Sequence, residues 1–126
     1  MNDKLTAQQN EIVNLLKTIE EIKTCQGHGG ELDDVKKLTI KLPAVLVWFD
    51  GEAYQKEGQT SYIRRPEFHA IVMTKNVAKE SKRLATGLDL IDLVLDKLEL
   101  VVHDLKATEP IENSKSYFIA AVKFIW

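Results

Sequence analysis

The chain has 126 residues, the length of a single domain, and we treat 1–126 as one unit. Its 17 basic and 19 acidic residues give a net charge of −2, so we expect no nucleic-acid or anionic-membrane partner held by bulk electrostatics. A hydrophobic fraction of 44% with 29% charged residues is typical of a folded globular domain.

The sequence contains no feature that indicates export or membrane insertion. Residues 1–10 lack the basic head and apolar centre of a signal peptide, and no apolar run approaches the roughly 20 residues that span a bilayer. The single cysteine, Cys25, cannot form an intramolecular disulfide, so the fold does not depend on an oxidising compartment. We therefore expect a protein that is made and folded in the cytosol.

The first predicted element is a helix over about 6–24. Thr6 and Gln9 have the spacing of a capping box at its start. Apolar residues recur at steps of three and four and predict one buried stripe: Ile12, Leu15, Leu16, Ile19 and Ile22. The glycines of 26–30 predict the end of the helix, and the charged stretch 31–41 predicts a loop with a short strand.

Two strands are predicted next. The unbroken apolar run 44–49 predicts a strand that is covered on both faces. Residues 50–60 are polar and contain glycine, which favours a long connecting loop over a tight turn at Asp50-Gly51. The second strand, about 62–74, alternates: Phe68, Ala70 and Val72 lie on one face, and His69, Ile71 and Met73 lie on the other.

The second half of the chain predicts a helix and two further strands. The helix covers about 77–100, with Asn76 as its N-cap. Its predicted apolar face is a ladder widened by Ala85 and Val94: Leu84, Leu88, Ile91, Leu95 and Leu98. Residues 104–111 predict a strand that Pro110 restricts to a sheet edge. A turn at 112–115 leads into a final strand, 116–126, with apolar residues on both faces.

The order helix–strand–strand–helix–strand–strand predicts an α+β fold, with a four-stranded, mainly antiparallel or mixed sheet packed by two helices. Two helices cover one face of such a sheet. The other apolar face then needs a cover, which a neighbouring subunit would supply. The alternative is a final strand that is central and buried within the monomer.

The candidate residues for chemistry are few. Cys25 and His28 have the spacing of a metal-ligand pair, but a structural zinc site needs about four ligands and no second cysteine exists. A nucleophilic Cys25 would need a histidine base, and no known signature surrounds it. We therefore predict no catalytic, cofactor-binding or metal-binding residue, and we interpret 25–30 as a loop that ends a helix.

Asp89, Asp92 and Asp96 fall on one face of the second predicted helix. Such a stripe can gather cations or a basic partner, and paired acids can share a proton in catalysis. It lies opposite much of the leucine ladder, which favours a solvated helix face.

The one basic and aromatic cluster consists of Tyr54, Tyr62, Arg64 and Arg65. It suits contact with a negatively charged protein surface or with phosphates, or it is the exposed base of a long hairpin. The net charge favours protein over nucleic acid. With the neighbouring Trp48 and Asp50, these are the residues that we predict to contact a protein partner.

The arrangement of these segments resembles the Mu-like phage tail protein family, over about 6–126 but not clearly over 26–42. The features that carry the resemblance are Pro43-Ala-Val-Leu-Val, Gly51 and a polar loop, Arg65, Phe68 with alternating apolar residues, Asn76 before a helix, and the closing Ser116-Tyr-Phe-Ile-Ala-Ala-Val-Lys-Phe124. That family is similar in fold to the tail terminators of long-tailed phages.

The resemblance implies a structural protein that is not an enzyme and has no cofactor. Its subunits would form a ring, expected to be a hexamer, that sits on the end of a tail tube, halts polymerisation and presents a surface for head joining. The implied partners are other copies of the chain, the tail tube protein and a head–tail connector protein. Assembly would occur in the bacterial host cytoplasm, and the protein would end in the virion tail. The loop 50–60 would be a contact element.

Two alternatives remain open. One is a head–tail joining (neck) protein of similar fold. The other is a small cytosolic enzyme that uses Cys25, or the stripe of Asp89, Asp92 and Asp96.

Overall fold

The computed structural model describes residues 3–29, 40–75, 80–114 and 117–126. Its elements in chain order are α1 (Asp3–Leu16), β1 (Thr24–His28), β2 (Ala44–Glu57), β3 (Ser61–Lys75), α2 (Glu80–Leu98), β4 (Asp104–Asn113) and β5 (Tyr117–Ile125). Of the helices described, neither combines the length and apolarity needed to cross a membrane.

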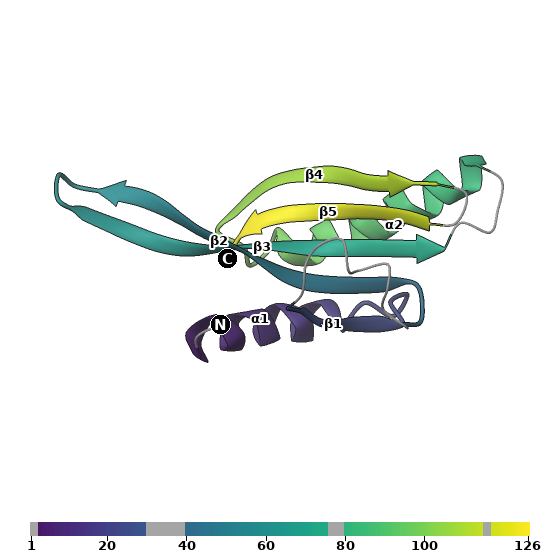
Figure 1. Cartoon of the computed structure of the whole chain (residues 1–126), viewed down its shortest axis with the longest axis horizontal. Coiled ribbons are helices and arrows are strands. Elements are labelled where there is room, and N and C mark those ends of the chain that lie inside the picture. Colours follow the sequence, from purple (N-terminus) through teal and green to yellow (C-terminus); the bar gives the residue numbers. More distant parts are fainter. Residues whose placement is uncertain (1–2, 30–39, 76–79, 115–116) are drawn as a thin grey trace.

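The predicted α+β class has the right elements, but the prediction of a four-stranded sheet is wrong. Within the described residues the sheet has five strands in the order β1-β2-β3-β5-β4 (Figure 1). β1 pairs with β2 in parallel, and the other neighbouring pairs are antiparallel. The additional strand is 24–28, which we expected to finish the first helix and form a loop. Its backbone groups pair with β2 instead, because the chain after α1 returns along the sheet edge.

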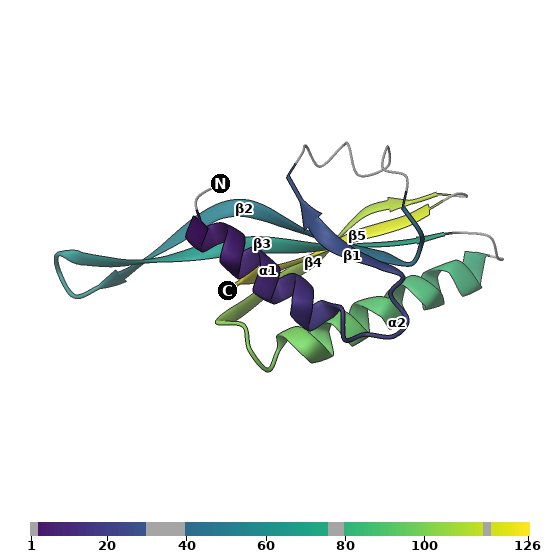
Figure 2. The same ribbon diagram turned by 90° about the horizontal axis from the view of Figure 1, so that it is seen from below.

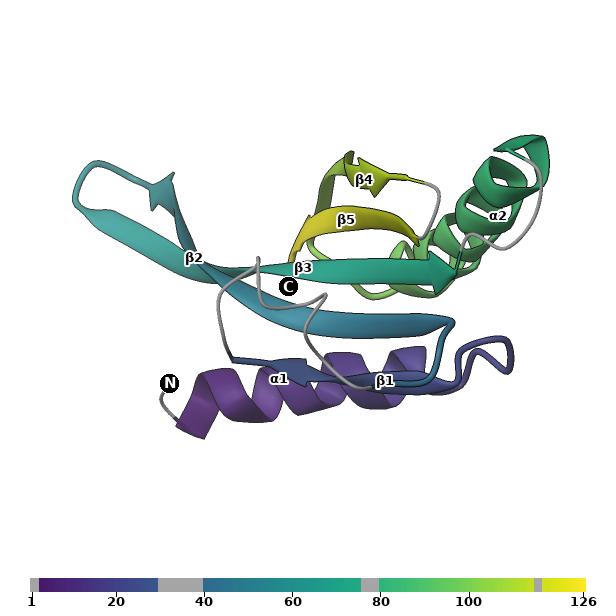
Figure 3. The same cartoon turned by 45° about the vertical axis from the view of Figure 1, so that its right-hand side comes forward.

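Both helices pack on one face of the sheet, as Figures 2 and 3 show. The main core lies between them and the strands. Its fully buried side chains include Ile12 and Leu16 from α1, Val94 and Leu98 from α2, and Val45, Val47, Phe68 and Phe124 from the sheet. This arrangement follows from period-two alternation along the strands and three-to-four spacing along the helices.

The opposite face of the sheet is also buried within the chain. Leu46, Ile71, Met73 and Ile119 form a second apolar cluster there, against which Ile40, Leu42, Trp48 and Tyr117 pack. β5 lies between β3 and β4, so it is a central strand. A neighbouring subunit is therefore not needed to cover this face, and the alternative of burial within the monomer is correct. The predicted alternation of β3 is confirmed.

The first helix is shorter than predicted. α1 begins at Asp3 and ends at Leu16, so Thr6 is not a cap and the capping-box prediction is wrong. Gln9 points inward instead, and its Nε2 donates a buried hydrogen bond of 2.8 Å to the carbonyl oxygen of Val47. Ile19, beyond the helix, is nevertheless buried, as the apolar stripe predicted.

The apolar face of α2 agrees only in part with the predicted ladder, since Ile91, Val94 and Leu98 are buried as predicted. The buried residues are Leu90, Ile91, Val94 and Leu98, whereas Leu88 is 47% exposed. Gly87 accounts for the different buried face. A Cβ built there would lie 2.3 Å from Phe118 Cδ1, so only glycine lets this side of the helix approach β5 so closely. The proposed N-cap Asn76 and the side chain of Leu84 lie outside the described residues.

The predicted loop 50–60 is largely strand. β2 continues to Glu57 and pairs with β3 as far as Ser61, leaving only a turn at residues 58–60. Gly51 and Gly58 have φ angles of 97° and 73°, which suit the bulge after Phe49 and the turn. These residues are too polar for a buried strand, but here the two strands pair with each other and stay largely exposed.

We call residues 52–57 and 61–66 the arm, because this two-stranded ribbon projects beyond the rest of the sheet (Figure 1). β1 ends at His28, opposite Trp48, and β5 begins its pairing with β3 at Glu67. The arm therefore has no further strand on either side among the described residues. At the other end of the sheet order, β4 is an edge strand, as Pro110 predicted.

Candidate functional site

The arm carries four of the residues that the sequence predicted to contact a partner. Tyr54 lies opposite Arg64 in the strand register, and Tyr62 lies opposite Lys56. Both tyrosines are among the most exposed apolar side chains described, at 66% for Tyr54 and 63% for Tyr62. Tyrosine offers a large, rigid contact area with a polar end, which is why it is frequent in protein interfaces.

A fork of two hydrogen bonds joins the strands at the base of the arm. Arg64 donates from Nε to Glu52 Oε2 at 2.9 Å and from a terminal nitrogen to Glu52 Oε1 at 2.8 Å. The hydrogen bond from Arg64 lowers the pKa of the Glu52 carboxyl. The guanidinium is exposed to solvent, so the pair fixes geometry more than it adds stability.

The predicted contact residues do not share one side of the arm. Tyr62 and Arg64 are even-numbered residues of β3, as is Phe68, so their side chains continue the helix-bearing face of the sheet. Tyr54 pairs with Arg64 and lies on the same side. Arg65 lies on the opposite side, together with Ala53. A groove of about 270 Å³ at the arm base is lined by Ala53, Tyr54, Arg65, His103, Asp104 and Ile125.

A group of charged side chains lies where the arm leaves the sheet, on the face opposite the helices. We call it the charged cluster; it comprises Asp50, Glu67, His69, Lys106, Glu109 and Lys123. Lys106 Nζ lies 2.7 Å from Glu67 Oε1, and Lys123 pairs with Glu109. One carboxylate oxygen from each of Asp50 and Glu67 and one ring nitrogen of His69 lie within 4.8 Å of one another.

His69 is the buried member of the charged cluster. Its side chain is only 6% exposed, and its Nε2 lies 2.9 Å from Asp50 Oδ2. In the described part of the chain, however, neither ring nitrogen makes a hydrogen bond of acceptable geometry. Burial lowers the pKa of the imidazole, and the Asp50 carboxylate opposes this shift. The Trp48 ring packs against it, with 5.3 Å between ring centroids.

The structure thus separates the predicted contact residues into two groups. Tyr54, Tyr62, Arg64 and Arg65 lie on the arm, whereas Trp48 and Asp50 lie beside the charged cluster. Sequence reasoning missed Glu67 and His69 as neighbours of Asp50. The available signal was the pair of ionisable residues at alternate positions, Glu67 and His69, in a strand that is otherwise apolar from Phe68 to Met73.

The environment of Cys25 does not favour a nucleophile. Burial raises the pKa of its thiol from 9.0 to about 11, against a smaller opposite effect of Lys17. A reactive cysteine requires the reverse shift. Cys25 and His28 are three residues apart in β1, so their side chains point to opposite faces of the sheet. The predicted helix-ending loop is wrong here, because both residues belong to a strand.

Asp89, Asp92 and Asp96 are all exposed on α2, which agrees with the interpretation of a solvated helix face. No described contact brings them to Cys25 or to the charged cluster.

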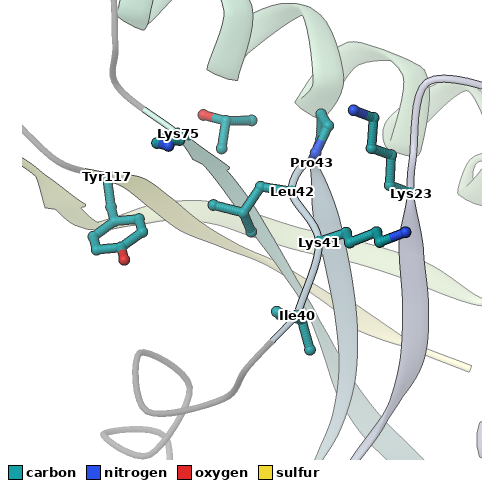
Figure 4. Close-up of a pocket in the computed structure, with 8 residues that line it drawn as sticks. Lys23, Ile40, Lys41, Leu42, Pro43, Lys75 and Tyr117 are labelled. Carbon is teal, nitrogen blue, oxygen red and sulfur yellow. The ribbon is translucent and has the colours of Figure 1, made fainter.

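A separate groove of about 500 Å³ lies at the far end of β2 from the arm. It is lined by Lys23, Ile40, Lys41, Leu42, Pro43, Thr74, Lys75 and Tyr117. Figure 4 shows the three lysine side chains extending in different directions instead of toward a common point. This geometry does not form a focused anion site, although Thr74 Oγ1 is buried there without a hydrogen-bond partner among the described residues.

Comparison of the sequence with protein-family models and with curated proteins finds no match.

Proposed function

We propose that this chain is a phage or prophage tail terminator-like structural protein, whose copies form a ring on the end of a tail tube. The observation that carries the proposal is the arm, which presents Tyr54 and Tyr62 to solvent beyond the body of the domain. The resemblance of the chain to the Mu-like phage tail protein family agrees with this function.

The arm has the properties of a segment that needs a partner. Its base, at Glu52 and Arg64, lines a pocket with the start of α1, but beyond that the ribbon has no third strand among the described residues. A two-stranded ribbon by itself is at best marginally stable in water. Each of its strands has about six residues, which corresponds to a reach of about 20 Å. Holding such a ribbon away from the core has no benefit for the stability of a monomer, so we infer that it serves contact between molecules.

The partner that we infer for the arm is a neighbouring copy of the same chain. In a ring each subunit offers one surface and receives another, so an arm on one side must meet a different surface on the next subunit. The strand β4 offers such a surface. It ends the described sheet order, and its residues are almost all exposed. In this arrangement Tyr54 and Tyr62 are the anchors.

The first experiment measures assembly. We expect the purified chain to form rings at high concentration, with six subunits the expected number, by mass measurement in solution and negative-stain imaging. The double variant Tyr54→Ala/Tyr62→Ala should raise the protein concentration at which rings form by at least tenfold. Leu100→Ala, which removes an 80% exposed apolar side chain outside the arm, should not. A chain that stays monomeric at every concentration would contradict the proposal.

The second experiment concerns the role of the ring. Rings that bind the ends of tail tubes, together with abnormal tail length when the gene is lost, are expected for a terminator. Rings that bind portal-proximal rings and leave tail length unchanged indicate the head–tail joining alternative. Assembly in the bacterial host cytoplasm and presence in the finished virion tail follow from either role.

A further inference from the structure

We propose that Asp50, Glu67 and His69 form a binding site for one divalent transition-metal ion of the Zn²⁺ or Co²⁺ class. The site lies at the base of the arm and joins β2 to β3. It does not depend on the function proposed above, because it is complete within one chain.

The geometry of the three side chains suits a common ion. Their ligand atoms all lie within 4.8 Å of one another, and the His69 and Asp50 atoms are 2.9 Å apart. Two ligands that are each about 2.1 Å from one ion lie about 3 to 4 Å apart. Small rotations of the carboxylates are therefore sufficient. Asp50 has 38% of its side chain exposed, which leaves a path for the ion to enter.

The buried imidazole is the independent reason to expect a ligand. The His69 side chain is 94% buried, and neither ring nitrogen makes an acceptable hydrogen bond within the described residues. The Asp50 carboxylate lies 2.9 Å from Nε2 without the geometry of a hydrogen bond, and native structures usually satisfy buried polar groups. A metal ion beside the two carboxylates would satisfy one ring nitrogen directly.

The donor set indicates the class of ion. Imidazole nitrogen favours zinc and its neighbours in the transition series, and carboxylate oxygens complete such sites. Two carboxylates and one neutral imidazole carry a charge of −2, which balances a divalent cation. Three protein ligands leave at least one coordination position for water.

The main competitor for the site is Lys106. Its ammonium group lies 2.7 Å from Glu67 Oε1, so an ion must replace it as the partner of that carboxylate. Lys123, also in the charged cluster, pairs with Glu109 and is less directly involved. This competition supplies the sharpest test, because removal of the Lys106 charge should strengthen metal binding.

The bound ion would hold the arm in a fixed direction. Asp50 precedes Gly51 at the bulge in β2, where the strand register shifts between Phe49 and Glu52. Glu67 is the first β3 residue that pairs with β5. An ion between them would therefore brace the point at which the arm leaves the sheet.

The test uses the full chain without an affinity tag, treated with chelator and then titrated with Co²⁺, followed by its visible absorbance, and with Zn²⁺ by calorimetry. We expect one ion per chain. Asp50→Asn and Glu67→Gln should each weaken binding at least tenfold, and Lys106→Met should strengthen it. The controls Asp89→Asn, an exposed carboxylate on α2 outside the charged cluster, and Cys25→Ser should bind within about threefold of the parent chain.

Several results would overturn the proposal. These are no saturable binding at millimolar metal, binding that survives both Asp50→Asn and Glu67→Gln, or loss of binding in Cys25→Ser. Circular dichroism checks that each variant is folded. If either carboxylate variant unfolds, the decision passes to Lys106→Met, an exposed substitution: unchanged or weaker affinity in that variant overturns the site.

Discussion

Gln9 on α1 donates a 2.8 Å hydrogen bond to the carbonyl oxygen of Val47 on β2. The bond joins the first helix to an interior strand across the core, between residues 38 positions apart in the sequence. Gly27 on β1 permits this contact. A Cβ built at Gly27 would lie 2.9 Å from the Gln9 amide, so a larger residue there would displace the side chain.

Gln9→Ala should destabilise the folded chain by about 1–3 kcal/mol, because it leaves a buried carbonyl without this donor. The measurement is the free energy of unfolding in urea. Asn10→Ala is the matched control, since Asn10 is exposed on the same helix and its replacement should change stability by less than about 0.5 kcal/mol. Equal stability of the parent and Gln9→Ala chains would show that the hydrogen bond contributes nothing.

Gly27→Ala should destabilise the parent chain but have little effect in the Gln9→Ala background. The three nearest atoms that its Cβ would meet belong to the end of the Gln9 side chain, so the clash with them disappears when that side chain is removed. A double-mutant cycle on the free energies of unfolding should give a coupling of about 0.5–3 kcal/mol. Strictly additive effects would mean that Gly27 is required for another reason.

Gly87→Ala should destabilise the chain by about 1–3 kcal/mol through overpacking, although alanine is the better helix former by about 1 kcal/mol. Its Cβ would lie within 2.3–2.8 Å of three Phe118 ring atoms. Thermal unfolding measures the effect. Gly29→Ala is the control, because a Cβ there meets no atom within 4 Å. The double variant Gly87→Ala/Phe118→Leu should recover part of the loss.

The sequence predicted the parts of the fold that depend on simple periodicity. The prediction of which β3 side chains between Phe68 and Met73 face which side of the sheet is correct. A shift of one residue would move every side chain to the other face, so the pattern of a buried strand strongly fixes its register. The edge position of β4 also follows from Pro110 alone. Such local signals have only one structural solution each.

Other parts depended on contacts that the sequence does not encode locally. Thr24–His28 has no apolar alternation, and it becomes a strand only because β2 offers a parallel partner. The face of α2 is set by Gly87 against Phe118, a contact with a residue 31 positions later. Neither could be read from helix or strand patterns.

The candidate site was predicted only in part. Polarity made residues 50–57 resemble a loop, whereas an exposed ribbon can also be polar on both sides. The sequence grouped Tyr54, Tyr62 and Arg64 and left an exposed hairpin base as one of two interpretations. The convergence of Asp50 with Glu67 and His69 depends on the bulge at Gly51. A bulge of one residue is not visible in a single sequence.

Cys25 should be nearly unreactive in the folded chain. Burial raises the pKa of its thiol from 9.0 to about 11, so the thiolate fraction at pH 8 falls about a hundredfold relative to an unfolded chain. Alkylation by iodoacetamide should accordingly be far slower in buffer than in concentrated urea, at the same pH. Comparable rates in the two conditions would show that the thiol is open to solvent.

The same shift makes stability depend on pH in the alkaline range. Below pH 9 both states hold the proton, so the contribution of Cys25 to stability is fully present. Between pH 9.0 and about 11 the unfolded chain loses the proton while the folded chain retains it, and the free energy of unfolding falls as pH rises. Unfolding in urea between pH 8 and 11 measures this slope. Cys25→Ala should lose less stability over that range than the parent chain, and identical slopes in the two proteins would mean that Cys25 is not the group responsible.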